Sequence, residues 1–395
     1  MCTLGTNVPA CGVALMNSWS NSEPIVVARP SRLPIQFVPA ERLAFGEPGD
    51  YKPCLGVLAD GTILLTGFHP HDRENGQVYE EIFLARSRVG GGTWSPREIP
   101  PLLGREPYVS ATHGDVLFVT AQHLENDVRN PHGHVYALVH RSEDAGRSWS
   151  SLAITPTDIS GAGAKPWVVT SRNILERADG TLILGVSAPR GHDYLWRSID
   201  AGQTWDRSVR CTFADIDTER LWWPFWAETV LWEALNGDLL GLWRIDPRLV
   251  PPLAGSLSPD YTSDNIERLI VLRSVDGGRR WTREPELGSW YGEMYPSLLR
   301  LPDGRLLCTF TVRSLNRPLG VHAVLGRETP DGLAFDFQHD RLIIDVQTPT
   351  AASRSGGGFG PSVLTSGGAL LTAYSWRDFE GITHVEIVRW HAPAG

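Results

Sequence analysis

The stretch "RSIDAGQTW", residues 197–205, decides the fold because the chain repeats it. Two close copies are "RSEDAGRSW" at 141–149 and "RSVDGGRRW" at 273–281, while "RSRVGGGTW" at 86–94 keeps the pattern without the acid. The Asp carboxylate can accept hydrogen bonds from backbone N–H groups of its own turn, and the Gly can adopt a conformation closed to other residues. The Trp offers a large flat surface for packing. The pattern therefore predicts a repeated turn between two strands, with structural roles for Asp144, Asp200, Asp276, Trp149, Trp205 and Trp281.

A second repeated phrase alternates with this turn and consists of an apolar strand, a tight turn and another apolar strand. One copy is "SRNILERADGTLILGVSAP", which starts at residue 171. Asp-Gly, Asn-Gly or Gly-Gly pairs between such strands are typical of β-hairpins. The six hairpin turns lie 54 to 67 residues apart, at Asp60, Gly114, Asp179, Asn236, Asp303 and Gly367. One unit thus has four antiparallel strands, and six units fill the chain.

Six four-stranded sheets arranged radially form a β-propeller, which protects its sheet edges by closing the ring. The 40 glycines and 29 prolines, with no long segment of helical periodicity, oppose a helical fold. We expect an all-β, six-bladed β-propeller over residues 23–395, after an irregular N-terminal extension over residues 1–22. The last unit lacks a fourth strand. We predict that "PIVVA", residues 24–28, supplies it, so that an N-terminal strand pairs with the last blade and closes the ring.

The amino-acid composition excludes some classes of binding partner. The formal net charge of -9 opposes a nucleic-acid surface, which needs a basic stripe. The expected partner is a glycan or a small acidic sugar. The five cysteines lack the spacing of metal ligands, so we expect no metal and no other cofactor. No apolar stretch is long enough for a membrane span and no signal peptide is visible, so we expect a cytoplasmic protein. The oligomeric state stays open.

The repeated turn resembles the Asp-box, or bacterial neuraminidase repeat, of the sialidase superfamily, where it connects the third and fourth strands of a blade. The resemblance extends over nearly the whole chain through the six hairpins. The resemblance is specific for the propeller fold. It is much less specific for activity, because Asp-boxes also occur in propellers without catalytic activity. Strands alternate in direction, so the hairpin turns and the Asp-boxes share one face of the disc. A functional site is expected on the opposite face, around the central funnel.

The predicted site face collects the positions where first strands begin and second strands end. First strands begin at Tyr51-Lys52, Arg105-Glu106, Ser171-Arg172, Glu228, Glu293-Met294-Tyr295 and Phe359-Gly360. Second strands end at residues 69–73, His123, residues 190–193, Arg244, residues 313–317 and Arg377-Asp378. A funnel with arginines, carboxylates and histidines suits an acidic sugar.

The resemblance implies roles for several of these residues. In sialidase-like enzymes, a blade like the fourth unit carries the Glu that acts as base for a tyrosine nucleophile, together with one of three arginines that bind the substrate carboxylate. Glu228 and Arg244, 16 residues apart across a hairpin, match that pair. Arg317, with Arg313 close by, matches another of the arginines, whose planar guanidinium can bind a carboxylate through two hydrogen bonds. The simpler alternative is a salt bridge at the rim between Glu228 and Arg244.

The sequence also departs from the family pattern. The first arginine is missing from "DYKPCL", where Lys52 stands, and Arg105 is a candidate substitute. The sixth unit begins "GFGPSV" without a tyrosine, so Tyr295 is the nearest replacement nucleophile. Asp72, in "HPHDRENG", matches the position of the acid. Four histidines at the site face are candidates for substrate binding or for an alternative acid/base set, or are rim residues bonded to their neighbours: His69, His71, His123 and His192.

Three functions follow as hypotheses. The first is a sialidase-like glycoside hydrolase of the exo-α-sialidase type, acting on a terminal acidic sugar, in which an Asp assists the leaving group and a Tyr forms the covalent intermediate. The second is a polysaccharide lyase acting on uronate polymers, in which Arg neutralises the carboxylate and Tyr and His move protons. The third is a glycan-binding propeller without catalytic activity.

Overall fold

A computed structural model describes residues 18–20, 23–28, 36–114, 116–163, 167–245, 268–284, 293–313, 319–329, 332–335, 341–345, 357–358 and 362–394. These residues form strands and three short 3-10 helices, η1 (Glu74–Gly76), η2 (Pro156–Asp158) and η3 (Thr218–Arg220), which confirms the all-β prediction. Most of the predicted extension over residues 1–22 lies outside the described residues. No helix within the described ranges has the length and apolar character needed to cross a membrane.

The strands form six sheets, and the first three follow one another along the chain. The first sheet contains β4 (Tyr51–Val57), β5 (Ile63–Asp72) and β6 (Val78–Ser87). The second sheet contains β7 (Arg105–Ala111), β8 (Leu117–His123), β9 (Tyr136–Ser142) and β10 (Ser150–Ile154). The third sheet contains β11 (Val169–Thr170), β12 (Leu175–Glu176), β13 (Leu182–Ala188), β14 (His192–Ser198) and β15 (Asp206–Arg210).

The remaining three sheets complete the set, and two of them incorporate N-terminal strands. The fourth sheet contains β16 (Thr212–Phe213), β17 (Val230–Glu233), β18 (Leu239–Ile245), β19 (Arg268–Ser274) and β20 (Arg280–Arg283). The fifth sheet contains β21 (Glu293–Arg300), β22 (Arg305–Val312), β23 (Gly320–Thr329), β24 (Gly332–Phe335), β25 (Arg341–Ile343), β1 (Ile25–Ala28) and β2 (Gln36–Val38). The sixth sheet contains β26 (Gly357–Gly358), β27 (Val363–Leu364), β28 (Leu370–Arg377), β29 (Thr383–Trp390) and β3 (Ala40–Phe45).

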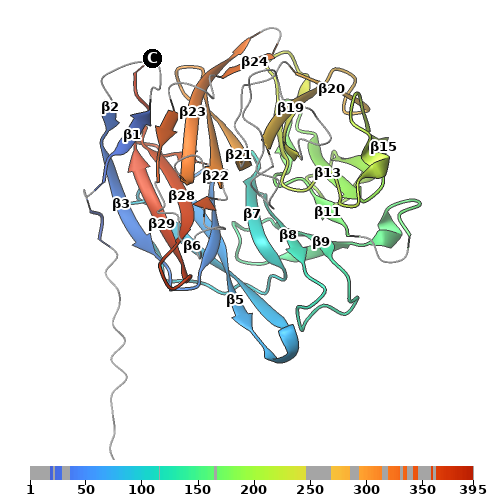
Figure 1. Cartoon of the computed structure of the whole chain (residues 1–395), viewed down its shortest axis with the longest axis horizontal. Helices are drawn as coiled ribbons and strands as arrows, with labels where there is room; N and C mark the ends of the chain where they lie inside the picture. Colours follow the sequence, from blue (N-terminus) through green and yellow to red (C-terminus); the bar gives the residue numbers. More distant parts are fainter. Residues whose placement is uncertain are drawn as a thin grey trace, which may run out of the picture.

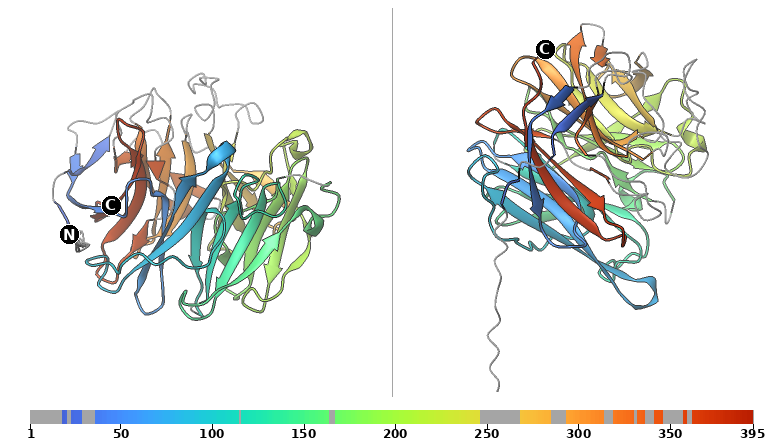
Figure 2. Two further views of the ribbon diagram at one scale, coloured as in Figure 1. Left: turned by 90° about the horizontal axis from the view of Figure 1, so that it is seen from below. Right: turned by 60° about the vertical axis from the view of Figure 1, so that its left-hand side comes forward.

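The sheets are arranged as a closed ring (Figures 1 and 2). Contacts between strands join each sheet to the next: β4 to β7, β9 to β11, β12 to β17, β18 to β21 and β22 to β26. Contact between β28 and β4 then joins the last sheet to the first. Buried apolar side chains fill the spaces between successive sheets, as in the cluster that contains Trp226, Trp243 and Trp281. This arrangement confirms a β-propeller.

The predicted count of six four-stranded blades is not confirmed. Five sheets have four or more strands, and the first sheet has three, so the described residues form five complete blades. The segment after β6 does not continue the ladder as a regular strand: it has an isolated bridge between Leu84 and Glu98 and a hydrogen bond from the Ser95 N–H to the Arg86 carbonyl. The turn before this segment has Val89 where the other copies have Asp, and prolines at 96, 100 and 101 have no N–H to donate to a ladder.

An N-terminal strand closes the ring, but it is not the predicted one. β3 pairs antiparallel with β29, with Leu43 opposite Ile387. The "PIVVA" segment instead forms β1, which pairs with β25 at the edge of the fifth sheet, Val27 lying opposite Leu342. Both segments have the residue types of a strand, so their β-propensity could not decide which sheet each one joins.

The repeated turns have the hydrogen bonds expected of them. In the copy that contains Asp200, its Oδ1 accepts a hydrogen bond from the Thr204 N–H at 2.9 Å, and the Gly202 N–H donates to Ser198 Oγ at 2.8 Å. Hydrogen bonds to the carboxylate lower the pKa of Asp200 to about 2, and the bond from the Thr204 hydroxyl contributes most. Asp144 and Asp276 accept backbone hydrogen bonds in the same way. The Trp281 ring is fully buried, and Trp149 and Trp205 pack partly buried against the core.

Strand register places these turns away from the predicted site face. In the second sheet, Ser142, which begins the Asp144 turn, pairs with Leu117, and Leu117 pairs with Ala111 at the end of β7. The opposite end of the same strands has Arg105 at the start of β7 and His123 at the end of β8. The two ends therefore lie on opposite faces of the disc, as the alternation of strands requires.

Candidate functional site

Three first strands share a distortion that presents a polar side chain at the centre of the ring. Lys52, Glu106 and Tyr295 each precede a proline, and the ladder of β4, β7 and β21 shifts register at that point. Their φ angles are 48°, 54° and 53°, and Glu228, ahead of β17, has a φ of 59°. A bulge redirects a side chain, and non-glycine residues in this left-handed region cost free energy that the surrounding structure must offset.

Hydroxyl groups of the neighbouring sheets hold these distorted segments. Thr66 Oγ1, on β5, donates to the carbonyl of Pro107 at 3.3 Å. Thr120 Oγ1, on β8, donates to the carbonyl of Arg172. The Lys52 N–H donates to Ser375 Oγ, on β28, at 3.4 Å. Each bond joins the second strand of one sheet to the first-strand segment of the next, so the ring itself positions the central side chains.

The Tyr295 hydroxyl lies between two cations. Lys52 Nζ donates a hydrogen bond to Tyr295 Oη at 2.9 Å, and Arg313 Nη2 donates to the same oxygen at 3.3 Å. The Lys52 and Arg313 charges also lie near the face of the phenol ring, 4.7 and 5.1 Å from its centroid. All three side chains are buried. The contacts thus surround the phenol oxygen with donors that favour negative charge on it.

Two carboxylates complete the group. Glu106 accepts hydrogen bonds from Lys52 Nζ and from Arg172 Nη2, the latter at 2.7 Å. Glu228 Oε2 accepts a hydrogen bond from Arg244 Nη1 at 2.6 Å, and Arg172 Nη2 lies 3.4 Å from the other Glu228 oxygen. The Tyr295 cluster is defined here as Lys52, Glu106, Arg172, Glu228, Arg244, Tyr295 and Arg313.

Burial and charge act in opposite directions on the acidic groups of the Tyr295 cluster. Burial alone would raise the pKa of Glu106, but Lys52, Arg172 and Arg105 hold it well below its usual value. Burial likewise opposes ionisation of Glu228, and Arg244 and Arg172 outweigh it and lower the pKa. Burial raises the pKa of Tyr295 far above its usual value, although Arg313 opposes the rise. At neutral pH the cluster therefore holds two carboxylates and a neutral phenol.

The predicted residues divide by position into those that join the Tyr295 cluster and those that do not. Lys52, Glu228, Arg244, Tyr295 and Arg313 converge as described. Arg105 lies beside the cluster, with Nε 3.6 Å from Glu106 Oε1 and 3.5 Å from Glu80 Oε1. Arg317 lies outside the described residues.

Asp72 is exposed at the end of β5, and the structure does not bring it to the Tyr295 cluster. Phe68 pairs with Tyr51 near the centre, and Asp72 lies four residues further along the strand. At a rise of about 3.3 Å per residue, Asp72 lies about 13 Å from Phe68 along the strand. The hairpin of β5 and β6 projects from the disc (Figure 1), and Asp72 is the last residue of β5.

The four predicted histidines belong to the first, second and third sheets. His69 Nδ1 contacts Asp50 Oδ1 at 2.8 Å, and the His71 ring lies 4.7 Å from the His69 ring. His192 lies at the start of β14 against Gly161. His123 is fully buried, with Nδ1 bonded to Tyr136 Oη at 2.7 Å. Each histidine contacts its own local neighbours.

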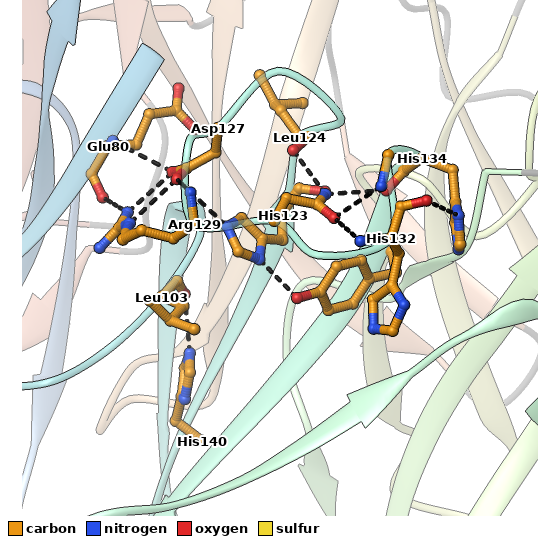
Figure 3. A network of polar contacts seen from close by, with 12 residues as sticks. Glu80, Leu103, His123, Leu124, Asp127, Arg129, His132, His134 and His140 are labelled. Carbon is orange, nitrogen blue, oxygen red and sulfur yellow. Dashed lines mark hydrogen bonds and ion pairs between the residues drawn. The ribbon is translucent and has the colours of Figure 1, made fainter. Parts of the chain in front are cut away.

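His123 belongs to a separate polar network on the second sheet (Figure 3). Its Nε2 lies 3.5 Å from Asp127 Oδ1, and Arg129 contacts the same carboxylate at 3.0 and 2.8 Å. Arg129 also donates to the backbone carbonyl of Glu80, which ties this network to the first sheet. Burial lowers the pKa of His123 despite Asp127, so the imidazole is neutral at pH 7.

Glu106 and Arg172 have no role in the predictions from sequence, although they bind the other members of the Tyr295 cluster. A signal for Glu106 exists: the residue before proline in "YKPCL", "REPYV" and "MYPSL" is Lys52, Glu106 or Tyr295 at equivalent places. Arg172 occupies the corresponding place in the third unit without a proline after it. Among the described residues, no group of three or more His, Cys, Asp and Glu side chains has a geometry that could hold a metal ion.

No family model and no curated protein matches the chain in sequence. Solved structures match its fold. A protein of unknown function from Dyadobacter fermentans has a TM-score of 0.62 and 18% identity, with 95% of this chain and 100% of that one covered. The leech intramolecular trans-sialidase, complexed with 2,7-anhydro-Neu5Ac, has a TM-score of 0.58 and 12% identity, with 87% and 67% covered.

Two further enzymes show the same likeness. The intramolecular trans-sialidase from Ruminococcus gnavus has a TM-score of 0.58 and 14% identity, with 87% of this chain and 94% of that one covered. The Trypanosoma rangeli sialidase in complex with sialic acid has a TM-score of 0.54 and 14% identity, with 94% and 57% covered. At these identities the likeness establishes the fold: this chain has the propeller fold of sialidases.

Proposed function

We propose that the chain is a sialidase-like glycoside hydrolase that removes a terminal acidic sugar from a glycan. The observation that carries the proposal is the Tyr295 hydroxyl held between Lys52 and Arg313 at the centre of the propeller. In the proposed reaction, Tyr295 Oη attacks the anomeric carbon as the bond to the leaving group breaks, and water later releases the sugar from the tyrosine. The sialidases of the same fold support this reaction class.

The charges assign the other roles in the proposal. Tyr295 is a neutral phenol at rest because burial raises its pKa, so it must lose its proton during attack. Glu228 is the proposed base, since the lowered pKa keeps its carboxylate ionised at neutral pH. Arg244 and Arg313 are the proposed ligands of the substrate carboxylate, and Lys52 provides a further positive charge. We also propose that the repeated turns are Asp-boxes and that the substrate is a glycan.

The test is hydrolysis of a fluorogenic aryl sialoside. We expect Tyr295→Phe and Glu228→Gln each to lower kcat by roughly 100-fold or more, the usual range for loss of a nucleophile or base. Tyr136→Phe is the matched control, because Tyr136 is also buried and hydrogen-bonded but lies in the His123 network. Native activity that survives Tyr295→Phe unchanged would remove the proposed nucleophile.

Asp72 is proposed as the proton donor to the leaving group, and two substrates test it. An aryl leaving group departs without protonation, whereas the lactose of 3′-sialyllactose needs an acid. We expect Asp72→Asn to leave hydrolysis of the aryl sialoside unchanged and to slow hydrolysis of 3′-sialyllactose. Equal rates of 3′-sialyllactose hydrolysis in the native chain and the variant would exclude Asp72 as the proton donor. Asp72 is exposed at the end of β5.

A glycan-binding propeller without catalytic activity is the second candidate. It is favoured by the ion pairs that already hold both Glu106 and Glu228. Binding of an acidic sugar without hydrolysis of any sialoside would support it. The remaining alternative, a uronate lyase, predicts a rise in ultraviolet absorbance on uronate polymers from the unsaturated product, with dependence on Tyr and His residues.

A further inference from the structure

Two exposed tryptophans lie in the segments that lead directly into the Tyr295 cluster. Trp167 precedes β11 and is five residues ahead of Arg172, and its ring is 43% exposed. Trp222 follows η3, is six residues ahead of Glu228, and is 68% exposed. An extended chain spans at most about 3.6 Å per residue, so each tryptophan lies within about 22 Å of its cluster residue.

Hydrogen bonds place both tryptophans on the site face. The N–H of Val168, next to Trp167, donates to the carbonyl of Val135 at 3.2 Å, just ahead of β9. The carbonyl of Leu221, next to Trp222, accepts a hydrogen bond from the Arg190 N–H at 3.0 Å, in the turn between β13 and β14. Connections from second to third strands lie at the same ends of the sheets as the starts of the first strands. The two rings therefore open onto the face that holds the Tyr295 cluster.

The two indoles form one surface. The ring centroids of Trp167 and Trp222 lie 5.7 Å apart at an interplanar angle of 57°. Trp223 packs against Trp222 edge-to-face at 5.4 Å and 81°, which restricts the orientation of the more exposed ring. Indoles offer large, rigid contact surfaces with little rotamer entropy to lose on binding. Two adjacent exposed rings held in this way are suited to bind a flat, partly apolar ligand.

The charged residues around the two rings indicate which class of ligand the rings can bind. Arg220 and Asp217 form an exposed ion pair at 2.9 Å beside this segment, and Arg190 is exposed in the adjacent turn. A lipid surface or an apolar helix needs a larger continuous apolar patch than two rings bordered by charges. A pyranose ring fits better, because its C–H face can pack on indole while its hydroxyls bond to Arg and Asp side chains.

We propose that Trp167 and Trp222 form a binding site for a neutral pyranose of the glycan substrate. The link to a substrate rests on the proposed function, in which the acidic end of the same glycan occupies the Tyr295 cluster. The binding site itself requires only a neutral sugar. It would extend recognition from the terminal sugar to the residues that follow it in the glycan.

Ligand-observed saturation-transfer NMR with lactose tests this site, because lactose has no acidic group for the Tyr295 cluster. We expect the native chain to bind lactose, and Trp167→Ala and Trp222→Ala each to weaken binding about tenfold, or about 1.4 kcal/mol. Phe379→Ala is the matched control, since that ring is 82% exposed in the turn between β28 and β29 on the same face. Circular dichroism checks that each variant is folded.

The outcomes separate this inference from the proposed hydrolysis. Lactose binding that is absent in the native chain, or unchanged in both folded tryptophan variants, overturns the sugar-binding site even if the aryl sialoside is hydrolysed. Loss of lactose binding in Trp222→Ala with no sialoside hydrolysis by the native chain supports the site and contradicts the hydrolase. With both activities present, Trp222→Ala should raise KM for 3′-sialyllactose and leave KM unchanged for a methyl sialoside, which has neither a second sugar nor an aromatic ring.

Discussion

The buried carboxyl groups near the centre of the propeller differ in charge state because they differ in partners. Glu106 contacts three cations and Glu228 contacts two, and these cations keep both pKa values low. Glu80, on β6 beside Arg105, is buried with a pKa raised to about 7, because burial outweighs the attraction of Arg105 and because Glu106 and Asp127 repel its charge. Environments that separate carboxyl pKa values in this way leave one group protonated next to ionised ones.

The raised pKa of Glu80 predicts a pH-dependent loss of stability. Its pKa is about 7 in the folded chain against 4.5 as the ordinary value. The protonated Glu80 therefore makes its full contribution to the free energy of unfolding below about pH 4.5. This contribution, up to roughly 3 kcal/mol, is lost as the pH rises through 7. Glu80→Gln keeps the uncharged shape, so we expect the variant to have a higher Tm than the native chain at pH 8 and a similar Tm at pH 5.

Thermal unfolding from pH 5 to pH 9 measures this difference. Glu74→Gln is the control, because Glu74 is exposed at the tip of the same hairpin. A Glu80→Gln curve that runs parallel to the native curve across the pH range would show that Glu80 does not carry the effect. Asp193, buried on β14 with a pKa that burial raises to about 7, contributes in the same direction and stays unchanged in both variants.

The Tyr295 cluster shows which contacts a sequence can predict at this scale. Glu228 and Arg244 could be paired from a spacing of 16 residues, because a strand out and back brings both to one end of a sheet. Lys52 and Tyr295 are 243 residues apart and meet because the propeller closes. The hydrogen bond between them, and the two hydrogen bonds that Glu106 accepts, depend on the bulges at Lys52, Glu106 and Tyr295. The residue before proline marks where each bulge lies, but that pattern does not predict which partner each side chain meets.

At the scale of elements, the repeated turns depend on glycine for two separate reasons. Gly202, in the Asp200 turn, has a φ of +79°, and an added Cβ would lie 2.5 Å from Phe118 of the second sheet. Gly180, in the hairpin between β12 and β13, has a φ of +82° and no atom within 4 Å of an added Cβ. The first glycine therefore permits both the turn and the close packing of two sheets, and the second permits only the turn.

Alanine at the two glycines separates these effects. We expect Gly180→Ala to cost about 1 kcal/mol of unfolding free energy from backbone strain. Gly202→Ala should cost about 1 to 3 kcal/mol more, because Phe118 is fully buried and cannot move aside without overpacking. Urea unfolding measures both values. Equal costs in the two variants would show that the contact between the turn and the neighbouring sheet adds nothing.

The hydroxyl bonds between sheets make a second prediction for elements. Thr120 is buried on β8 and donates to the Arg172 carbonyl at the centre. Thr120→Val keeps the side-chain shape and removes the bond, so we expect a loss of about 1 kcal/mol in stability from the lost buried hydrogen bond. Thr112→Val, at the other end of the same hairpin, removes a partly exposed hydroxyl bond and is the control. A smaller loss for Thr120→Val than for Thr112→Val would contradict the role assigned to this bond.

For the whole molecule, the sequence predicted the repeating unit and the propeller better than it predicted how the ring closes. Both motifs are local: the hairpin recurs in all six units and the repeated turn in four of them. The choice between β1 and β3 as the closing strand is global, because it depends on which edge remains open once the other sheets are in place. The residues of β3, "AERLAF", include two charges, yet its buried Leu43 and Phe45 fill the space against the first and sixth sheets.

Closure by β3 predicts that the ring unfolds as a unit. Leu43 is 1% exposed opposite Ile387, so Leu43→Ala should destabilise the chain by about 2 to 5 kcal/mol. If closure stabilises every sheet, hydrogen exchange should show lower protection both in β3 and in the distant β18. Phe37→Ala, at a 62% exposed position on β2, should change neither. Lower protection confined to β3 and β29 would instead mean that the sixth sheet opens alone and that the other sheets do not depend on the closing strand.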